Sequence, residues 1–454
     1  MKKILVLGAG KSATTLIHYL LEHADTYDWQ VIVGDYSLEI AERKVDNHAR
    51  GKAVFFDVND AELRAKYVAD ADVVASVLPA KFHYLVAQDC LRLGKHIITP
   101  SYVSTSEKAM HADFEAAGLL FMGEIGLDPG IDHMSLMKMI GDITQKGGNI
   151  TAIRSFTGAL IAPESDTNPW HYKFTWAPMN VVLAGQGTAQ YLKNGLPRYV
   201  PYNRLFSFTE VHEVEGYGKF EAYANRDSLL YLDKYNIPEV PTFVRGTFRK
   251  AGYCPSWNAL VQLGLTDNNI DIINAKNLSY KQFVDAFIPF KKGDETKSID
   301  VRLADFLDVA IDSEVMNNLR WLELLSDRPI VLKKATPAEI LLQLLEEKWK
   351  LSAEDKDMIV MLHKIDYELN GEQREHTSAL VMKGKNADET ALAATVGLPM
   401  AMMAKLILNN EINLTGVHIP IVAQVYEPIL AELQNYGVTF NNKDEAISSK
   451  AVEA

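Results

Sequence analysis

Short apolar runs alternate with amphipathic segments over the first ~125 residues of the chain. The apolar runs predict strands at residues 4–7, 31–34, 53–56, 73–77, 96–99 and 119–122. Apolar positions at helical spacing fill the gaps, most clearly over residues 36–48 and 84–93. Strands that alternate with helices predict an α/β fold with a doubly wound parallel sheet of the Rossmann type.

The pattern changes after residue 128. Pro129 and Gly130 interrupt the chain, and Asp132 is suited to cap a helix that begins near His133. Strand-like aromatic segments follow at residues 150–160, 205–214 and 220–223, and a mostly helical stretch follows over 256–350. Strand character returns at residues 358–367 and 375–382, and residues 388–408 predict a helix rich in small residues.

These changes predict three domains. A dinucleotide-binding Rossmann domain covers residues 1–128, and a C-terminal segment of about residues 388–441 is expected to return to it. A mixed α/β catalytic domain comprises residues 129–255 and 351–387, with a helical domain at 256–350 inserted between its parts. A chain of 454 residues is too long for one ordinary core, which favours several domains.

Composition narrows the classes of function. A hydrophobic content of 48% and a charged content of 23% are typical of soluble globular proteins. The net charge of −13 argues against nucleic acid as the main partner, and an anionic ligand needs a local cationic pocket. Cys90 and Cys254 show no zinc or disulfide spacing, and no targeting segment or bilayer span is evident, so we expect a cytoplasmic protein.

The segment between the first predicted strand and the following helix is typical of a dinucleotide site. It reads G-x-G-x-x-A from Gly8 to Ala13, with Lys11 and Ser12 inside it. Gly8 allows a tight turn, Gly10 lets the backbone approach a pyrophosphate, and Ala13 lets the helix pack closely on the strand. The helix N-terminus then offers N–H groups and a positive dipole end to the phosphates.

Two acidic residues end the next two strands. Asp35 ends the second strand, where a carboxylate accepts hydrogen bonds from the adenosine ribose and repels a 2′-phosphate. This placement favours NAD over NADP, although Asp35 could instead be a helix N-cap. Asp57 ends the third strand, where it could meet the adenine amino group or serve as an N-cap or turn residue.

Other candidates lie at the carboxyl edge of the predicted sheet. Leu78 follows the fourth strand near the expected nicotinamide site. Lys81 and His83 come next and could bind a carboxylate or transfer protons, or could be solvated loop residues. Ser101 and Tyr102 follow the fifth strand, where their hydroxyls could bind a carboxylate or position a water, with a surface turn as the alternative.

Asp128 stands in a Leu-Asp-Pro-Gly loop between Leu127 and Pro129. Its carboxylate would suit a general base or an amine-binding group. The residues alone favour a simpler role, in which the side chain stabilises an Asx-Pro turn.

Arginines cluster further along the chain, at Arg226, at Arg245 followed by Gly246 and Thr247, and at Arg249. Guanidinium groups bind carboxylates bidentately, so the cluster suggests a site for a polycarboxylate. Structural salt bridges and solvated faces are the competing interpretation. No G-x-S-x-G elbow, P-loop, H-E-x-x-H or paired C-x-x-C occurs in the sequence, so we expect neither a hydrolase nucleophile nor a metal site.

At these residues the chain resembles a known family, the saccharopine dehydrogenases of the L-glutamate-forming type, also called saccharopine reductases. The matching segments are 6–10 (VLGAG), 100–102 (PSY), 124–133 (EIGLDPGIDH), 172–176 (YKFTW), 225–228 (NRDS), 245–247 (RGT) and 393–399 (AATVGLP). They keep the family's order over nearly the whole chain, and the string at 124–133 is far more specific than the glycine motif.

The resemblance implies the same three-domain arrangement with a returning C-terminal segment. It also implies that saccharopine is bound by Ser101, Tyr102, Arg226, Arg245, Gly246 and Thr247, and that the loop of Leu127, Asp128 and Pro129 lies beside the cofactor. One departure concerns Asp35, because the fungal NADP-using members have a basic or neutral sequence there. The segment around Asp35 resembles instead the NAD-using degradative enzymes, including the dehydrogenase half of the animal bifunctional enzyme. Lys81 is a second departure, which argues against a catalytic role for it.

The sequence therefore predicts NAD-dependent oxidation of saccharopine to L-glutamate and 2-aminoadipate 6-semialdehyde, with NADP as a possible cofactor. Arginines would orient the carboxylates, and Asp128 with Tyr102 would serve as the catalytic groups. Closure about a hinge at residues 126–130 would exclude water. The expected partner is saccharopine, a polycarboxylate amino acid, with no nucleic acid and no membrane, and a homodimer is possible.

Three alternatives remain open. The first is an NADP-dependent saccharopine reductase of lysine biosynthesis. The second is an enzyme similar to the carboxynorspermidine dehydrogenases, whose cationic substrate would need acidic residues where we place arginines. The third is a non-catalytic dinucleotide sensor, which would bind cofactor without turnover.

Overall fold

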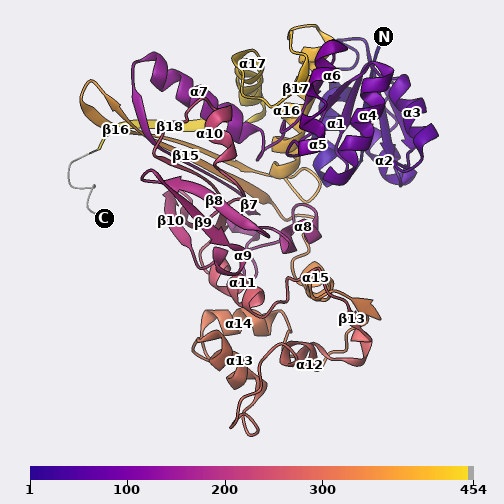
Figure 1. Ribbon diagram of the computed structural model, residues 1–454. Helices are drawn as coiled ribbons and strands as arrows, with labels where there is room; N and C mark the ends of the chain where they lie inside the picture. The colour runs from indigo at the N-terminus through magenta and orange to yellow at the C-terminus, as the bar shows by residue number, and fades with distance from the viewer. Residues whose placement is uncertain (448–454) are drawn as a thin grey trace. The chain divides into compact units, whose positions relative to one another are not determined.

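The computed structural model describes residues 1–447, which divide into two compact units (Figure 1). Within the described residues, the first unit contains residues 1–150 and 367–447, and the second contains residues 151–366. The three-domain division predicted from the sequence is finer than these units and stays a prediction. The first boundary falls at residue 150 rather than 128, and residues 256–350 are not separated from the rest of the second unit.

A parallel sheet forms the centre of the first unit. Its strands lie in the order β17-β6-β5-β4-β1-β2-β3, and each neighbouring pair is parallel. The strands are β1 (Lys2–Leu7), β2 (Trp29–Asp35), β3 (Gly51–Phe55), β4 (Val73–Ser76), β5 (His96–Ile98), β6 (Leu120–Met122) and β17 (Gly416–His418). The Rossmann-type sheet is thus confirmed, and the six strands predicted from apolar runs are present with ends shifted by at most two residues.

Helices connect these strands. They are η1 (Lys11–Ala13), α1 (Thr14–Glu22), α2 (Leu38–Val45), α3 (Ala61–Ala69), η2 (Ala80–Phe82), α4 (His83–Leu93), α5 (Thr105–Lys108), α6 (His111–Ala116), α7 (Ile131–Gln145), α16 (Ala391–Leu408), α17 (Ala423–Leu433) and η5 (Gln434–Tyr436). Side chains that accept a backbone N–H mark the first turn of several of these helices. Asp60 accepts a hydrogen bond from Leu63 at the start of α3, and Thr390 accepts one from Ala393 at the start of α16.

The C-terminal segment returns to the first sheet. β17 pairs with β6, with Gly416 opposite Leu120 and His418 opposite Met122. α16 packs closely against α1, because a Cβ on Gly397 would lie 2.6 Å from the backbone nitrogen of Leu16. The small residues of the predicted helix therefore allow a close approach between two helices.

Helix α16 is also long and apolar enough to cross a membrane, as judged by length and composition alone. In this structure 89% of its residues are buried inside the protein, which is the usual placement of a core helix.

An antiparallel pair completes the described part of the first unit. β16 (Glu372–Lys383) pairs with β18 (Phe440–Ala446), and Leu380 lies opposite Phe440. The returning segment predicted to end near residue 441 therefore stops short of the last strand. β18 is polar and mostly exposed, so it lacks the apolar alternation that marks a half-buried strand in a sequence.

The second unit contains a mixed sheet, as predicted, in the order β10-β11-β12-β7-β15. β12 runs parallel to β7 and antiparallel to β11, and a hairpin of β8 and β9 joins β12. The strands are β7 (Asn149–Ile161), β8 (Thr188–Lys193), β9 (Leu196–Pro201), β10 (Thr209–Val214), β11 (Gly218–Ala224), β12 (Thr242–Lys250) and β15 (Asp357–Leu369). A separate two-stranded sheet is formed by β13 (Ile272–Ile273) and β14 (Lys334–Ala335). The strand predicted at 205–214 begins only at Thr209, because Leu205 ends a short helix.

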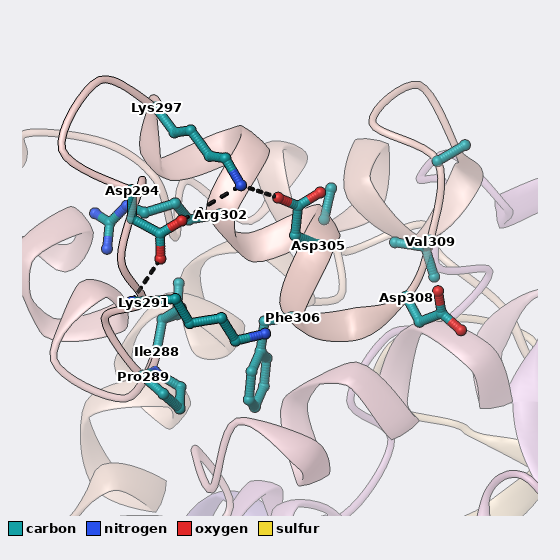
Figure 2. A pocket seen from close by; sticks show the side chains of 12 residues that line it. Ile288, Pro289, Lys291, Asp294, Lys297, Arg302, Asp305, Phe306, Asp308 and Val309 are labelled. Carbon is teal, nitrogen blue, oxygen red and sulfur yellow. Dashed lines mark hydrogen bonds and ion pairs between the residues drawn. The ribbon is translucent and has the colours of Figure 1, made fainter.

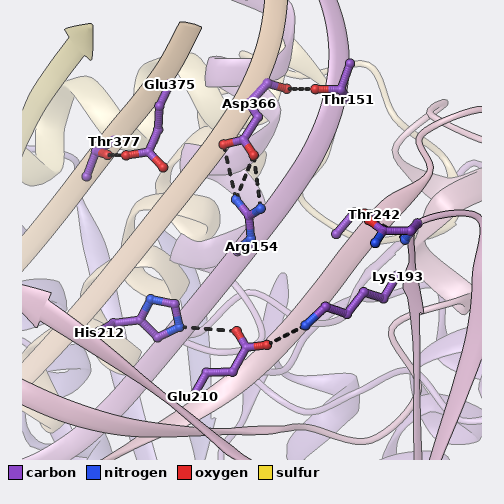
Figure 3. A network of polar contacts seen from close by, with 10 residues as sticks. Thr151, Arg154, Lys193, Glu210, His212, Thr242, Asp366, Glu375 and Thr377 are labelled. Atoms are coloured by element: carbon purple, nitrogen blue, oxygen red, sulfur yellow. Dashed lines mark hydrogen bonds and ion pairs between the residues drawn. The ribbon is translucent and has the colours of Figure 1, made fainter. Parts of the chain in front are cut away.

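An ion pair joins the two strands at which the second unit begins and ends (Figure 3). The guanidinium of Arg154 on β7 donates to both carboxylate oxygens of Asp366 on β15 at 3.0–3.1 Å. The hydroxyl of Thr151 donates to the Asp366 carbonyl at 3.1 Å. In the same view, Glu210 of β10 accepts a hydrogen bond from Lys193 of β8 at 3.1 Å. The Arg154–Asp366 pair joins neighbouring strands, whereas the Lys193–Glu210 contact links two strands that are not paired with each other.

The helical part of the second unit packs around tryptophans. Its helices are η3 (Pro163–Ser165), α8 (Pro178–Val182), α9 (Tyr202–Leu205), α10 (Leu230–Lys234), α11 (Tyr253–Gln262), η4 (Ala275–Asn277), α12 (Tyr280–Asp285), α13 (Ile299–Leu307), α14 (Glu314–Trp321) and α15 (Pro337–Lys348). Trp170, Trp257 and Trp349 are each at most 1% exposed and lie in one hydrophobic cluster. Ser or Thr residues cap α12 to α15, which explains why sequence patterning predicts this stretch as helical.

Candidate active site

The glycine turn lies directly between β1 and the first helical turn. Gly8 has a φ of +95°, and a Cβ there would lie 3.1 Å from the carbonyl oxygen of Val77. A side chain would therefore be strained and crowded at this position. The Gly8 N–H donates to the Gly34 carbonyl at 2.8 Å, so the turn is held against the end of β2. Gly10 and Lys11 are exposed, which leaves this backbone accessible to a phosphate.

Asp35 lies at the end of β2 beside the glycine turn. One carboxylate oxygen accepts the N–H of Ala9 at 2.7 Å, and the other accepts the N–H of Ser37 at 2.8 Å. The N-cap of α2 is Ser37, so Asp35 is not the cap residue that sequence reasoning allowed as an alternative. The carboxylate is half-buried and fixed where a Rossmann domain holds the adenosine ribose.

Asp57 is engaged in a local turn. Its Oδ1 accepts the N–H of Asn59 at 2.9 Å and the Asn59 side-chain amide at 3.1 Å. Helix α3 is capped by Asp60 rather than by Asp57. The turn role is therefore observed, and the adenine role stays a prediction. Leu78, half-buried, follows β4 at the same edge of the sheet.

The structure brings Tyr102 and Asp128 together. The Tyr102 hydroxyl donates to Oδ1 of Asp128 at 3.2 Å, and both side chains are half-buried. Tyr102 follows β5, whereas Asp128 lies 26 positions later, in the loop before α7. A phenol and a carboxylate in contact can share or relay a proton. The residues alone favoured a role for Asp128 in stabilising a turn, and that role does not account for its contact with Tyr102.

His83 forms a buried polar network below this edge. Its Nδ1 lies 2.9 Å from the hydroxyl of Ser76, and its Nε2 lies 2.9 Å from that of Thr99 and 2.8 Å from that of Ser101. The ring is 1% exposed, and burial lowers the pKa of His83 to about 4, so the ring is neutral at pH 7. His83 therefore connects the ends of β4 and β5 and orients Ser101.

Lys81 has a different environment from His83, although the two were considered together. Its side chain is exposed, with the ammonium nitrogen 4.9 Å from the centre of the Phe82 ring. Lys81 is therefore a solvated residue, which is the alternative that the sequence analysis gave to carboxylate binding or proton transfer.

The loop before α7 is closed on itself. Gly130 has a φ of +149°, and a Cβ there would lie 2.0 Å from the Gly126 carbonyl oxygen, so only glycine fits. The Gly126 N–H donates to the Pro129 carbonyl at 3.0 Å, and the Ile131 N–H donates to the Gly126 carbonyl at 2.9 Å. Leu127, 5% exposed, is held inside this loop.

Buried acidic and imidazole groups support that loop. Nε2 of His133 lies 2.8 Å from Oε2 of Glu124, and the other Glu124 oxygen accepts the Val103 N–H at 3.3 Å. Oδ1 of Asp132 accepts the Gly130 N–H at 2.7 Å. All three polar side chains are at most 2% exposed. Sequence reasoning assigned Asp132 to a helix cap and missed the other two, although all belong to the distinctive 124–133 string.

The predicted substrate arginines lie in the second unit. Arg226 is exposed, with a φ of +49°, and its carbonyl accepts the Gln190 N–H at 2.8 Å. Arg245 is 4% exposed, and its guanidinium lies 4.4 Å from the centre of the Tyr231 ring. The two are linked locally, because the Asn225 N–H donates to the Arg245 carbonyl at 2.9 Å.

Gly246 and Thr247 continue β12 beside Arg245. A Cβ on Gly246 would lie 2.6 Å from the Tyr223 carbonyl oxygen, so this position keeps β11 and β12 close. Thr247 lies opposite Thr157 of β7 and is half-buried. The Arg245–Thr247 stretch is therefore part of a central strand of the sheet.

Two lysines of the second unit, Lys173 and Lys297, are committed to ion pairs. Lys173 forms a buried ion pair with Asp355 at 2.7 Å. A cavity of about 500 Å³ lies beside α13 and is lined by residues between 288 and 310 (Figure 2). None of the predicted site residues lines it. Its Lys297 contacts Asp294 and Asp305 at 3.3 and 2.7 Å, so that cation is already neutralised. Among the described residues no group of three or more His, Cys, Asp or Glu side chains could hold a metal ion.

Comparisons with known proteins cover almost the whole chain. Residues 4–122 match the family model described as the saccharopine dehydrogenase NADP binding domain, and residues 126–438 match the saccharopine dehydrogenase C-terminal domain. The chain is 33% identical over 450 residues to the Saccharomyces cerevisiae saccharopine dehydrogenase (NADP(+), L-glutamate-forming), covering 98% of this chain and 100% of that protein.

A second group of relatives is longer. The chain is 32% identical to the alpha-aminoadipic semialdehyde synthase of Arabidopsis thaliana over 97% of its own length, but spans only 45% of that protein. It is also 32% identical to the mitochondrial enzyme of the same name from Bos taurus and spans 48% of it.

Solved structures agree with the sequence matches. The apo saccharopine dehydrogenase (L-Glu forming) of S. cerevisiae superposes with a TM-score of 0.87 at 31% identity, covering 99% of this chain and all of that chain. A homospermidine synthase of Legionella pneumophila in complex with NAD superposes with a TM-score of 0.58 at 9% identity, covering 100% of this chain and 93% of that chain, which shows a shared fold only.

Proposed function

Because the chain belongs to the saccharopine dehydrogenase family, L-glutamate-forming, we propose that it oxidises saccharopine to L-glutamate and 2-aminoadipate 6-semialdehyde. The observation that carries this proposal is the 33% identity to the S. cerevisiae enzyme over the full length of that protein. The contact between Tyr102 and Asp128 adds a proton-transfer pair in the unit that contains the glycine turn.

The residues of the first unit fit a nicotinamide dinucleotide. The exposed Gly10–Lys11 backbone would hold the pyrophosphate, and the Asp35 carboxylate would accept hydrogen bonds from the ribose. When bound, the dinucleotide accepts the hydride that leaves the lysine-side carbon next to the secondary amine. The chain's own residues must then bind the carboxylates, orient that carbon and manage the protons.

Asp128 is proposed as the group that takes the proton from the secondary amine, with Tyr102 holding its carboxylate in place. Loss of the amine proton and the hydride leaves a C=N double bond in the substrate. Water then adds to that carbon, and the carbon–nitrogen bond breaks to give the aldehyde and the amine of glutamate. Asp128 first returns its proton to the imine nitrogen, so that its carboxylate can accept a proton from the attacking water. Tyr102 can then relay that proton from Asp128 to the leaving nitrogen, while the freed carboxylate takes the hydroxyl proton as the carbon–nitrogen bond breaks.

We propose NAD rather than NADP as the cofactor, on the strength of Asp35. A fixed carboxylate at the end of β2 repels a 2′-phosphate, and Tyr36 and Ser37 supply no cation beside it. The description of the family model and the names of three relatives specify NADP, and they favour NADP as the alternative cofactor.

Steady-state rates with saccharopine and either NAD or NADP test both the proposed activity and the proposed cofactor. The reaction is followed at the absorbance band of the reduced nicotinamide. We expect turnover with NAD and a kcat/KM for NADP about 10-fold or more lower. A preference for NADP would overturn the cofactor assignment, and absence of turnover with both would overturn the activity. Asp35→Ser should lower kcat/KM for NAD and raise the ratio of NADP to NAD use. Asp113→Ser, which removes an exposed carboxylate on α6 outside the predicted cofactor site, serves as the comparison.

A further inference from the structure

Arg249 is a buried cation that the proposed reaction does not yet use. It is 4% exposed, and none of the ion pairs formed by residues 1–447 includes it. Its Nη1 donates to the Phe248 carbonyl at 3.0 Å, whereas its Nε is buried with no hydrogen-bond partner. Burying an unpaired guanidinium opposes folding, so the position calls for a compensating role.

Three tyrosines surround this guanidinium. Its central carbon lies 5.2 Å from the ring centre of Tyr253, 5.3 Å from that of Tyr172 and 5.7 Å from that of Tyr223. The rings offset part of the cost of burial and fix the direction of the side chain. They carry no negative charge, so they leave the guanidinium able to bind a carboxylate.

The nearest carboxylate along the sheet is committed elsewhere. Glu221 of β11 lies opposite Arg249 in the antiparallel register. Its two oxygens accept the N–H groups of Gly252 and Cys254 at 3.0 and 2.9 Å, at the start of α11. Glu221 therefore caps a helix and forms no hydrogen bond with the arginine.

Arg249 shares a face of β12 with two predicted substrate residues. Side chains alternate along a strand, so Arg245, Thr247 and Arg249 point to one side of the sheet. Arg245 and Arg249 lie about 13 Å apart along the strand, with the Thr247 hydroxyl between them. Both guanidiniums lie against tyrosine rings, and Ser155 and Thr157 of β7 lie beside this face.

We propose that Arg249 is a further substrate-binding residue, which holds one of the three carboxylates of saccharopine on the same face of β12 as Arg245. This inference rests on the proposed function, since it takes saccharopine as the ligand. Arg226 and Arg245 are the residues that the resemblance assigns to saccharopine, and Arg249 would supply a third cation for its three carboxylates. The buried position makes the contact selective, because a ligand without that carboxylate would leave the guanidinium unpaired.

The test compares Arg249→Met with Lys250→Met, in which the next cation on the same strand but the opposite face is removed. Saccharopine affinity is measured calorimetrically in the presence of NADH, which prevents turnover. We expect Arg249→Met to weaken saccharopine binding about 10- to 100-fold, with NADH affinity unchanged and Lys250→Met close to wild type. Because an apolar residue of similar volume replaces a buried charge, the thermal midpoint should stay the same or rise.

The outcomes separate the two proposals. If saccharopine fails to bind the wild-type protein, the proposed function is overturned and this inference with it. If saccharopine binds wild type and Arg249→Met equally well, only the role of Arg249 is overturned.

A second measurement covers a variant that fails to fold. Arg249→Lys retains a cation but loses the bidentate fork. Three saccharopine analogues, each with one carboxylate converted to an amide, are compared on wild type and Arg249→Lys. One analogue should bind both proteins equally, since it lacks the carboxylate that Arg249 holds, while the other two bind the variant more weakly. Equal weakening for all three would indicate an indirect effect and overturn the inference.

Discussion

The hydroxyl of Tyr102 donates a hydrogen bond of 3.2 Å to the carboxylate of Asp128, across a sequence separation of 26 residues. Asp128→Asn should lower kcat by about 10²- to 10⁴-fold, because an amide cannot accept the amine proton. Tyr102→Phe should lower kcat by about 10-fold, and the double variant should lose little more than Asp128→Asn alone, since the two groups act together. Steady-state kinetics over a range of pH provides the measurement.

Tyr84→Phe is the matched control, because this tyrosine is exposed on α4 and its variant should keep wild-type kcat. Additive losses in the double variant would contradict the proposed cooperation between Tyr102 and Asp128.

Arg226→Ala should raise KM for saccharopine about 10- to 100-fold with a smaller change in kcat, because a charged hydrogen bond to a carboxylate is lost. The local backbone bond to Gln190 uses the Arg226 carbonyl and survives the substitution. Arg198→Ala, which removes an exposed arginine on β9, should leave KM unchanged. An unchanged KM in Arg226→Ala would favour a cationic polyamine as the substrate.

The buried ring of His83 should make the free energy of unfolding depend on pH. Its pKa is about 4 in the folded protein and about 6.5 in an unfolded chain. Between these values the unfolded chain binds a proton that the folded protein does not, so stability falls as pH decreases from 6.5 to 4. The full loss amounts to about 3 kcal/mol. Denaturant unfolding at several pH values should show this loss in the wild type and a shallower slope in His83→Gln.

His18→Gln provides the comparison for this experiment, because His18 is exposed on α1 and its variant should keep the wild-type slope. Parallel curves for wild type and His83→Gln would show that His83 does not resist protonation in the folded state.

Gly397→Ala should destabilise the first unit by about 1–3 kcal/mol, because the new methyl group would overlap the backbone of α1. Gly141→Ala is the matched change within α7, where the nearest atom to the new methyl is the Tyr426 hydroxyl at 3.8 Å. That variant should gain about 0.5–1 kcal/mol from helix propensity. Thermal unfolding distinguishes the two, and equal midpoints would argue against close packing of α16 on α1.

The first sheet could be predicted because its strands are buried on both faces and therefore appear as continuous apolar runs. The positions of Gly8 and Asp35 at the strand ends could be predicted for a related reason, since each stands directly after such a run, whereas their roles toward a cofactor stay predictions. β17 could not be identified as a strand, because its sequence, Gly-Val-His, is not an apolar run and its partner β6 is far away in sequence.

Side-chain networks were harder to predict than strands. The sequence shows that His83 and His133 lie close to predicted site residues along the chain. It does not show that His83 is buried among three hydroxyl groups, or that His133 contacts Glu124. The same holds for Arg249, whose three tyrosine neighbours come from three different segments. Such environments depend on tertiary contacts, which local patterning does not encode.

The pairing of β17 with β6 has a consequence for synthesis on the ribosome. The edge of β6 stays uncovered until residues about 300 positions later have emerged, so the nucleotide-binding sheet spends most of translation with an open hydrogen-bonding edge. A nascent chain with this uncovered edge can pair wrongly with strands of other chains. We expect holding chaperones to associate with it until Gly416–His418 pair with β6.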